Sequence, residues 1–500
     1  MPSNGKTFYC AHTVLFIIAI IACITTWLIP AGQYDRIEYL KNKNEFVIQG
    51  KDSTISLPAT QNTLSKLGLN IEIQNFTEGK IFKPIAVPSS YHTLDNKPQG
   101  IIDFLQAFIK GFYSAIEVIL LVLVIGGLIG IVNATGAFNK GLAALSRALK
   151  GKEQLLIIFA FLLTCAGGTT FGMAEEVIAF LPIFIPVFLA AGYDVLVPLA
   201  TLYLGAATGT LGSTVNPFSV IIASNSAGIN WTIGTNSRVA MLFFASVVVL
   251  FYILRYAKRI KADPTQSLVY FAKQDHLSHF LKPSDSLTEK MDGKSSIILT
   301  LFIATFTGMV YGVINLNWWF VEMTTIFFSG SLLIAIVAGM PETKIVNSFI
   351  SGAQDLLSVA IIIAMARGVA IIMEDGLISD TILYYASLSV SEMPKWLFIN
   401  IMLLINLGLG VIISSSSGLA VLTMPIFAPL ADSVEIGREL IVSSYVFGFH
   451  LVQFISPTGL LLASLTLAKV PFNAWLKFIF PLLVVLLILS SAILTSSLFL

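Results

Sequence analysis

The sequence predicts an all-α polytopic membrane protein. Of its 500 residues, 56% are hydrophobic and only 11% are charged, against about 25% charged residues in an average soluble domain. The surplus lies in long apolar runs, several of which reach the roughly 20 residues that a helix needs to cross a bilayer. We expect about nine full crossings and two re-entrant hairpins, arranged as two repeats of inverted topology that each hold one hairpin and one broken transmembrane helix.

The chain divides into six parts by its apolar and polar runs. In order, we expect a first transmembrane helix within 1–32, an external polar flap at 33–100, membrane repeat 1 at 101–257, a cytoplasmic loop at 258–295, two transmembrane helices at 296–338 and membrane repeat 2 at 339–500. The flap is rich in Val, Ile, Thr and turn residues, which favours a small β-rich unit outside the membrane. We expect the first helix to stay uncleaved, because only Lys6 precedes its apolar run.

Two apolar stretches are interrupted near their middle by small and polar residues. The stretch 155–189 is broken at 167–176, and 397–430 is broken at 414–418. Each arm reads as short for a full crossing, so we expect two hairpins whose tips lie at mid-membrane, covered by protein or by a water-filled cavity. Two further runs, 196–226 and 441–467, contain polar residues beside a proline and predict broken helices.

Short motifs repeat along the chain at nearly one separation. Three motifs recur after 241, 243 and 240 residues: Phe-Ile-x-Gly at 108 and 349, Pro-Ile-Phe-x-Pro at 182 and 425, and Pro followed by Ala-Ser at 217 and 457. Five expected crossings separate the first repeat from the second, an odd number that inverts the second. Inverted repeats whose broken helices meet near the midplane are typical of secondary transporters.

Lysine and arginine gather in one set of loops. The segments 139–152, 255–294 and 340–346 carry four, eight and one of them, whereas 228–238, 374–396 and 431–440 carry one each. By the positive-inside rule the first set is cytoplasmic. We therefore expect a multi-pass protein of the cell (inner) membrane with its amino terminus in the cytoplasm and its carboxyl terminus outside.

Other classes of protein find little support in the sequence. A net charge of +1 gives no reason to expect a nucleic-acid partner, and the three cysteines lack the spacing of a metal site or a disulfide framework. No His-Glu-x-x-His, Gly-x-Ser-x-Gly or phosphate-binding loop occurs, so we expect no enzyme. We expect no cofactor or metal, apart from Na⁺ or H⁺ as a coupling ion.

The candidate substrate- and ion-binding residues lie at the hairpin tips and helix breaks, with one arginine added. Helix starts there offer N–H groups to a carboxylate, and helix ends offer carbonyls to a cation. The candidates are Thr169, Thr170, Gly172, Glu175, Glu176, Ser213, Thr214, Asn216, Ser414, Ser415, Ser416, Ser417, Ser456, Thr458 and Arg367. The alternative for the hydroxyls is capping and small-residue packing between helices, and for the prolines a plain kink.

Three charged residues stand out among these candidates. Glu175 and Glu176 have Gly418 and Leu419 as repeat partners, so the hairpin fold does not need acids. They either complement the helix dipole or serve function, by carrying a proton or pairing with a cationic group of the substrate. Arg367, in an apolar span, either pairs with an acid or clamps a substrate carboxylate.

Several runs resemble a known family. Thr-Phe-Gly-Met-Ala-Glu-Glu at 170–176, Gly-Ser-Thr-Val-Asn-Pro-Phe-Ser at 212–219 and Ile-Pro-Ala-Gly at 29–32 are similar to the YfcC branch of the C4-dicarboxylate anaerobic carrier family, within the ion transporter superfamily. The resemblance implies two hairpins, two broken helices, a substrate between their tips and a homodimer. Relatives use Ser-Asn-Thr tips to hold carboxylates and sodium, whereas here only Asn216 supplies an amide.

Together these features predict a secondary active transporter of a small carboxylate-bearing metabolite. The substrate is a C4-dicarboxylate or an amino acid, moved by exchange or by coupling to H⁺ or Na⁺. Branches of the family that exchange arginine for ornithine make a basic amino acid antiporter the alternative. An ion channel is the alternative from another class, although no repeated ring of charge is present.

Overall fold

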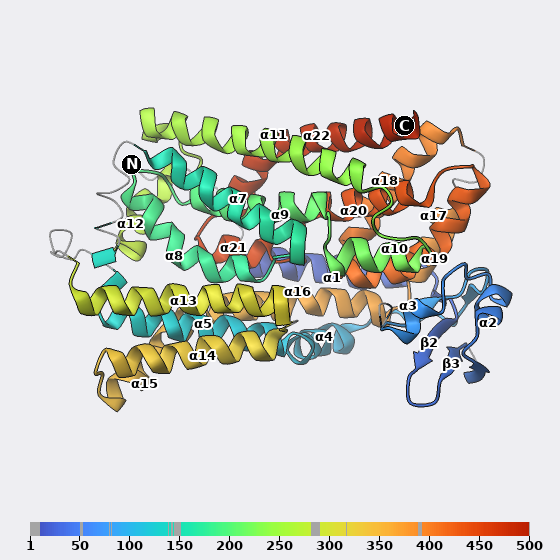
Figure 1. Cartoon of the computed structure of the whole chain (residues 1–500), viewed down its shortest axis with the longest axis horizontal. Coiled ribbons are helices and arrows are strands. Elements are labelled where there is room, and N and C mark those ends of the chain that lie inside the picture. The colour runs from blue at the N-terminus through green and yellow to red at the C-terminus, as the bar shows by residue number, and fades with distance from the viewer. Residues whose placement is uncertain are drawn as a thin grey trace.

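A computed structural model describes residues 11–50, 54–79, 81, 83–138, 140–141, 144, 152–281, 291–316, 318–388 and 393–499. Helices lie along the long axis of the molecule, and strands occur only at one end of it in this part of the chain (Figure 1). We call the end with the strands the sheet end. The opposite end, where helix α12 (Lys273–Phe280) lies, is the loop end.

The first half of the molecule comprises a short terminal helix, a compact strand-rich segment and the helices of the first repeat. Its helices are α1 (Ala11–Leu28), α2 (Gln61–Lys66), α3 (Gln74–Thr77), α4 (Ile101–Ser114), α5 (Ile116–Ala134), α7 (Glu153–Phe171), α8 (Glu176–Ala190), α9 (Leu196–Gly212), the π-helical turn Pro217–Ile221, α10 (Ile222–Ser226) and α11 (Thr235–Ala262). Helices α7 and α8 form the first hairpin, and α9 to α10 form the first broken helix.

The second half of the molecule repeats this succession after two further helices. Its members are α13 (Gly293–Leu316), α14 (Phe320–Val337), α15 (Glu342–Asp355), α16 (Leu357–Asp375), α17 (Ser379–Leu388), α18 (Lys395–Ile412), α19 (Ser416–Ser433), α20 (Arg438–Gln453), α21 (Leu461–Leu467) and α22 (Phe472–Ser496). Helices α18 and α19 form the second hairpin, and α20 to α21 form the second broken helix.

Nine helices of the described residues are long and apolar enough to cross a membrane, which confirms a multi-pass membrane protein. The number equals the expected one, but the members differ. The nine include the hairpin arms α7 and α18, whereas α1 is too short within the described part and α20–α21 is not among them. Agreement in the number of helices therefore does not support the expected arrangement of hairpins and spans, which depends on where each element lies.

Corresponding elements of the two halves make corresponding contacts. Helix α7 packs on α9 as α18 packs on α20, and α4 packs on α16 as α15 packs on α5. In Figure 1, α8 lies toward the loop end and α19 toward the sheet end. The order of elements thus occurs twice, and the inverted relation of the two sets stays a prediction.

The break of the first hairpin is shorter than we expected. Gly167 and Gly168 continue α7, which ends at Phe171, so the turn comprises only four residues and the arm of 19 residues is not short. The reason is close packing: a Cβ at Gly168 would lie 2.3 Å from the carbonyl oxygen of Ala206 in α9. Small residues let membrane helices approach in this way.

The second hairpin also turns within fewer residues than expected. Helix α19 begins at Ser416, so Ser417 and Gly418 belong to its first turn. Helices α12, α15 and α17 are further elements that the sequence analysis did not separate from loops or spans. All three are short, at 8, 14 and 10 residues, and lack the apolar length by which the spans were recognised.

The segment 33–100 folds as a small β-rich unit. Strands β2 (Arg36–Leu40), β3 (Glu45–Gln49), β4 (Thr54–Pro58) and β5 (Ile85–Ala86) form an antiparallel sheet in the order β4-β3-β2-β5, and β1 (Gly32–Gln33) pairs with β6 (His92–Thr93). Phe46 and Phe76 pack edge to face in its core. We call this segment the sheet segment.

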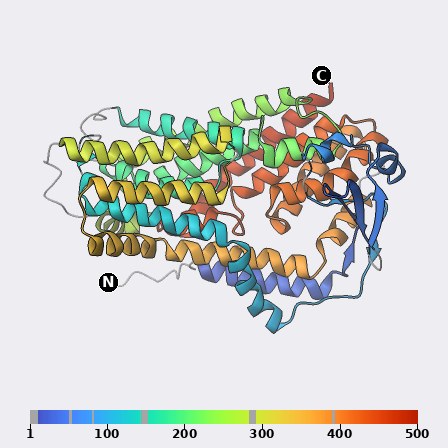
Figure 2. The same cartoon turned by 60° about the horizontal axis from the view of Figure 1, so that its bottom comes forward.

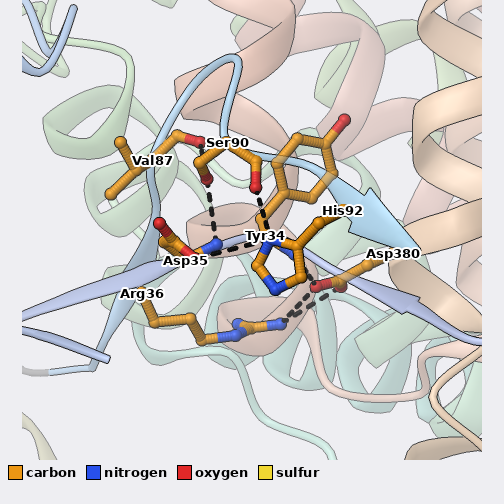
Figure 3. A network of polar contacts seen from close by, with 7 residues as sticks. All are labelled: Tyr34, Asp35, Arg36, Val87, Ser90, His92 and Asp380. Atoms are coloured by element: carbon orange, nitrogen blue, oxygen red, sulfur yellow. Dashed lines mark hydrogen bonds and ion pairs between the residues drawn. The ribbon is translucent and has the colours of Figure 1, made fainter. Parts of the chain in front are cut away.

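A polar network fastens the sheet segment to the second half of the chain (Figure 3). The guanidinium of Arg36 lies 3.1 Å from Asp380 at the start of α17, whose carboxylate also accepts a hydrogen bond of 3.0 Å from the backbone N–H of Tyr34. His92 Nδ1 lies 3.6 Å from the carboxylate of Asp35. Because Asp380 is buried, these donors hold the segment in a defined position over the helices.

Candidate substrate-binding site

The first hairpin tip meets the break of the first broken helix. The hydroxyls of Thr169 and Thr214 lie 3.0 Å apart, and Thr169 Oγ1 also accepts from the backbone N–H of Thr214 at 3.0 Å. Gly172 caps the end of α7 in the left-handed region at φ 76°, where a Cβ would lie 2.9 Å from the side-chain amide of Asn216. The structure therefore brings these four predicted residues together, with glycine required at the closest approach.

The break itself is held by its own polar side chains. Ser213 has φ 33°, and its hydroxyl donates to the carbonyl of Thr210 and lies 2.9 Å from that of Ser219. Asn216 accepts a hydrogen bond of 2.9 Å from the N–H of Phe218, which caps the π-helical turn. Ser213 and Asn216 are both buried, so the break is a fixed element of the site.

The second hairpin tip contacts the same break. Ser416 Oγ donates to the carbonyl oxygen of Phe218 at 2.9 Å, and the carbonyl of Ser416 accepts from the hydroxyl of Tyr445 in α20 at 2.6 Å. Ser415 caps α19, because its hydroxyl accepts from the N–H of Gly418 at 3.1 Å. Both tips thus converge on the residues that follow Ser213.

The remaining hydroxyl candidates lie less centrally in these contacts. Thr170 donates to Ala166 one turn back in its own helix at 2.6 Å. Ser414 is half-buried at the second tip. Ser456 and Thr458 are buried with their hydroxyls 2.8 Å apart, so these two side chains bond to each other. Helix α21, which follows this break, packs on α8 of the first hairpin.

The two acidic candidates occupy the turn of the first hairpin. Glu176 is buried and is the first residue of α8, and its carboxylate accepts from the N–H of Ala174 at 3.0 Å. Glu175 is half-buried at the position before the helix. Two carboxylates therefore stand next to each other at a helix start, where the dipole favours negative charge.

Arg367 lies away from the contacts between the tips and the first break. Its Nε donates to the hydroxyl of Ser114 in α4 at 2.8 Å, and its guanidinium lies 3.6 Å from the carboxylate of Glu374. An arginine paired with an acid was one of the two alternatives for this residue. The acid is seven residues further along the same helix, on the same face.

Two residues of this region were not predicted from the sequence. The ammonium of Lys83, in the sheet segment, donates to the hydroxyl of Ser417 at 2.7 Å. Tyr445 is buried in α20 and holds the second tip. No pattern in the sequence marks Lys83, because the contact joins residues 334 positions apart. Tyr445 lies close before a predicted helix break, which was the only available signal.

The comparison with known proteins decides the family. The sequence profile of the C4-dicarboxylate anaerobic carriers matches residues 8–498. The chain belongs to this family. It is a membrane transporter, as the sequence predicted, and the resemblance carried by the motifs at the first hairpin tip and the first break is confirmed.

Two relatives align with nearly the whole chain. An uncharacterized protein of Haemophilus influenzae is 43% identical over 490 residues, which are 97% of this chain and 96% of that protein. YfcC of Escherichia coli, named as a proposed basic amino acid antiporter, is 29% identical over 500 residues, covering 96% of this chain and 94% of YfcC.

Two solved transporter structures also align along the chain. MtrF of Neisseria gonorrhoeae, described as illuminating a class of antimetabolite efflux pumps, has a TM-score of 0.37 at 16% identity, covering 99% of this chain and 96% of MtrF. The YdaH transporter of Alcanivorax borkumensis, described as having an unusual topology, has a TM-score of 0.38 at 13% identity and covers 97% of each chain.

Proposed function

We propose that this transporter moves a small carboxylate-bearing metabolite, a C4-dicarboxylate or an amino acid, by exchange or by coupling to H⁺ or Na⁺. The observation that carries the proposal is the convergence of both hairpin tips on the first break, through Thr169–Thr214 and Ser416–Phe218. Helices α8 and α19 both begin there. Their first N–H groups and partial positive charge suit a carboxylate.

The same arrangement supports alternating access. In Figure 1 one hairpin lies toward each end of the molecule, and each tip contacts the residues after Ser213. Withdrawal of one tip at a time would open the site to one end only, which is how a secondary transporter differs from a channel. The cytoplasmic side of the loop end, the inner-membrane location and the homodimer remain predictions within this proposal.

A basic amino acid is the second candidate substrate. Glu175 and Glu176 place two acids at the first tip, and a carboxylate there can pair with the ammonium or guanidinium of a substrate such as arginine. The relative YfcC, whose name proposes a basic amino acid antiporter, favours the same substrate class. An amino acid would use the acids for its cationic group and the helix starts for its carboxylate.

Counterflow in proteoliposomes tests the proposal. Vesicles loaded with succinate, arginine or ornithine should take up the labelled form of the true substrate faster than empty vesicles, and uptake should saturate. Acceleration by succinate alone assigns a dicarboxylate carrier, and acceleration by arginine and ornithine assigns a basic amino acid antiporter. Uptake that neither saturates nor responds to internal substrate would overturn the transporter mechanism in favour of a channel.

A further inference from the structure

The sheet segment lies beside the helices of the second half, at the sheet end of the molecule (Figure 2). Its strand β5 packs on α19, and the ammonium of Lys83 donates to Ser417 Oγ, in the first turn of α19, at 2.7 Å. Residues 68–71 lie against the second half of the same helix, because they line a cavity of only about 10 Å³ together with Ala428 and Pro429. The sheet segment therefore touches α19 both at its start and in its second half.

The same loop of the sheet segment also touches the end of the first broken helix. Gly228 follows α10, and the carbonyl oxygen of Asn70 lies so close that a Cβ at Gly228 would meet it at 1.8 Å. Arg438 joins the two helices at this place, since its guanidinium donates to Asp432, near the end of α19, at 3.0 Å and to the carbonyl of Ala227 at 2.7 Å. The loop thus lies where the end of α19 meets the end of α10.

The close approach of Asn70, not the backbone conformation, accounts for the glycine at 228. The φ of Gly228 is 73°, and the corresponding residue of the second broken helix, 241 positions later, is Lys469 with φ 53°. Each comes two residues after the last residue of its helix, α10 or α21. A side chain is therefore compatible with this left-handed helix ending, and the carbonyl of Asn70 is what excludes one at 228.

The sheet segment is held more strongly on α17 than on α19. Arg36 pairs with the buried carboxylate of Asp380 at 3.1 Å, and the ring of Tyr91 stacks on that of Tyr384 with 4.1 Å between the ring centroids. On α19, by contrast, Lys83 donates to an uncharged hydroxyl. Because hydrogen bonds between charged groups are the stronger ones, the sheet segment should stay on α17 when α19 moves.

We propose that the sheet segment acts as a strap that holds the second hairpin closed, and that α19 must part from it before the second tip can leave the first break. The inference rests on the proposed function, because it assumes that this tip withdraws during transport. A segment that is bound to α17, α10 and α19 together cannot follow α19 alone. Withdrawal of the tip therefore breaks contacts with the sheet segment, which slows opening toward the sheet end.

Gly228→Ala loosens these contacts without touching either tip. The new Cβ displaces Asn70, and the loop moves off α10 and α19 together because it contacts both. The Cβ also comes within 3.2 Å of Arg438 Nη1, the end of a flexible side chain that can move aside. Gly68→Ala is the matched control, because Gly68 has the same φ of 73° and a Cβ there meets nothing within 4 Å.

The assay is counterflow in proteoliposomes of whichever of succinate or arginine the parent protein exchanges, with thermal unfolding measured alongside. We expect Gly228→Ala to exchange substrate faster than Gly68→Ala, by up to about tenfold, because weaker contacts lower the barrier to opening. Gly68→Ala should exchange at the parent's rate. A contact that only stabilises the fold predicts slower transport when it is lost, so equal or slower exchange by a folded Gly228→Ala protein overturns the inference.

A reversible link tests the same step in the opposite direction. Cysteines replace Asn70 and Pro429, which line the same cavity, in a protein whose three native cysteines are changed to alanine. A bifunctional thiol reagent with a cleavable bridge joins them before reconstitution. The link should slow counterflow by about tenfold or more, because it ties α19 to α17 through the sheet segment, and cleavage of the bridge should restore the rate. Each single-cysteine variant, treated with the same reagent, is the control and should transport like the untreated protein.

Two results with the link overturn the inference and leave the proposed function standing. Full counterflow by the linked protein would mean that α19 need not part from the sheet segment. A block that cleavage does not reverse would mean that modification, and not the link, stops transport. If the parent protein exchanges neither succinate nor arginine, the proposed function fails and the inference fails with it.

Discussion

Gly168 should be the most sensitive small residue of the first hairpin, because α7 and α9 touch there backbone to backbone. In Gly168→Ala the new Cβ would lie 2.3 Å from the carbonyl oxygen of Ala206 and 3.0 Å from the N–H nitrogen of Thr210. An ordinary contact needs about 3.5 Å. The two helices must therefore separate by roughly 1 Å, since the opposing atoms are backbone and have no rotamer to change.

Forced separation of this kind costs about 1–3 kcal/mol, which is offset in part by the better helix propensity of alanine, at most about 1 kcal/mol. We expect a net loss of up to about 3 kcal/mol in the free energy of unfolding. The next residue, Thr169, holds Thr214 at 3.0 Å, and a shift of roughly 1 Å breaks that bond. Transport should therefore fall together with stability.

The assay combines thermal unfolding in detergent with counterflow uptake in liposomes. The matched control is Gly408→Ala in α18, where a Cβ meets nothing within 4 Å. Its stability should equal or exceed that of the parent protein, because the only effect of the change is the better helix propensity of alanine. If Gly168→Ala unfolds and transports like Gly408→Ala, the close packing of α7 on α9 and the reasoning from it are refuted.

Three further predictions concern coupling, sidedness and the pH dependence of stability. If an acid carries the coupling proton, Glu175→Gln or Glu176→Gln should abolish uptake driven by a pH gradient and spare substrate exchange. Unchanged pH dependence of uptake in both variants would mean that these acids only complement the dipole at the start of the helix. Single cysteines at Lys258 and Glu435 should react with an impermeant thiol reagent from opposite sides of the membrane, and labelling from one side contradicts the predicted topology. Burial raises the pKa of Asp194, a loop carboxyl that accepts four hydrogen bonds, so the charged form is disfavoured in the folded state and stability falls as the pH rises from about 4 through the raised pKa. Asp194→Asn should therefore gain in melting temperature over the parent at pH 7 but not at pH 4, and equal differences at both pH values would show that ionisation of this carboxyl does not affect stability.

The apolar runs, the polar breaks and the repeated motifs allowed most of the helical order to be predicted. Length and hydropathy act locally, so the spans at 116–134 and 235–262 were recognisable. The extent of the first break was wrong because glycine has two uses. Gly167 and Gly168 were assigned to a turn, whereas both continue α7. Gly168 serves close packing on α9, and a Cβ at Gly167 would meet the side chain of Met173 in the turn, contacts that only the folded chain shows.

The sequence predicted which residues belong to the candidate site better than it predicted which of them touch. Thr169, Gly172, Thr214 and Asn216 were chosen for their place at a tip or a break, and the structure joins them. Lys83 lay beyond prediction because its partner depends on how a β-rich segment docks on helices made much later in the chain. The experiments above test whether this site binds substrate. Arg147 and Lys150, two of the four basic residues of 139–152, lie outside the described residues.

The bond between Arg36 and Asp380 has a consequence for biogenesis. The two residues are 344 positions apart, and at about 5–20 residues per second the ribosome needs roughly 20 to 70 seconds to pass from one to the other. During that time the sheet segment has emerged but lacks the surface on which it rests. It must stay folded on its own core around Phe46 and Phe76, or be held by a chaperone, until the last third of the chain is inserted. Truncation before α17 should thus leave a protein whose sheet segment is open to protease.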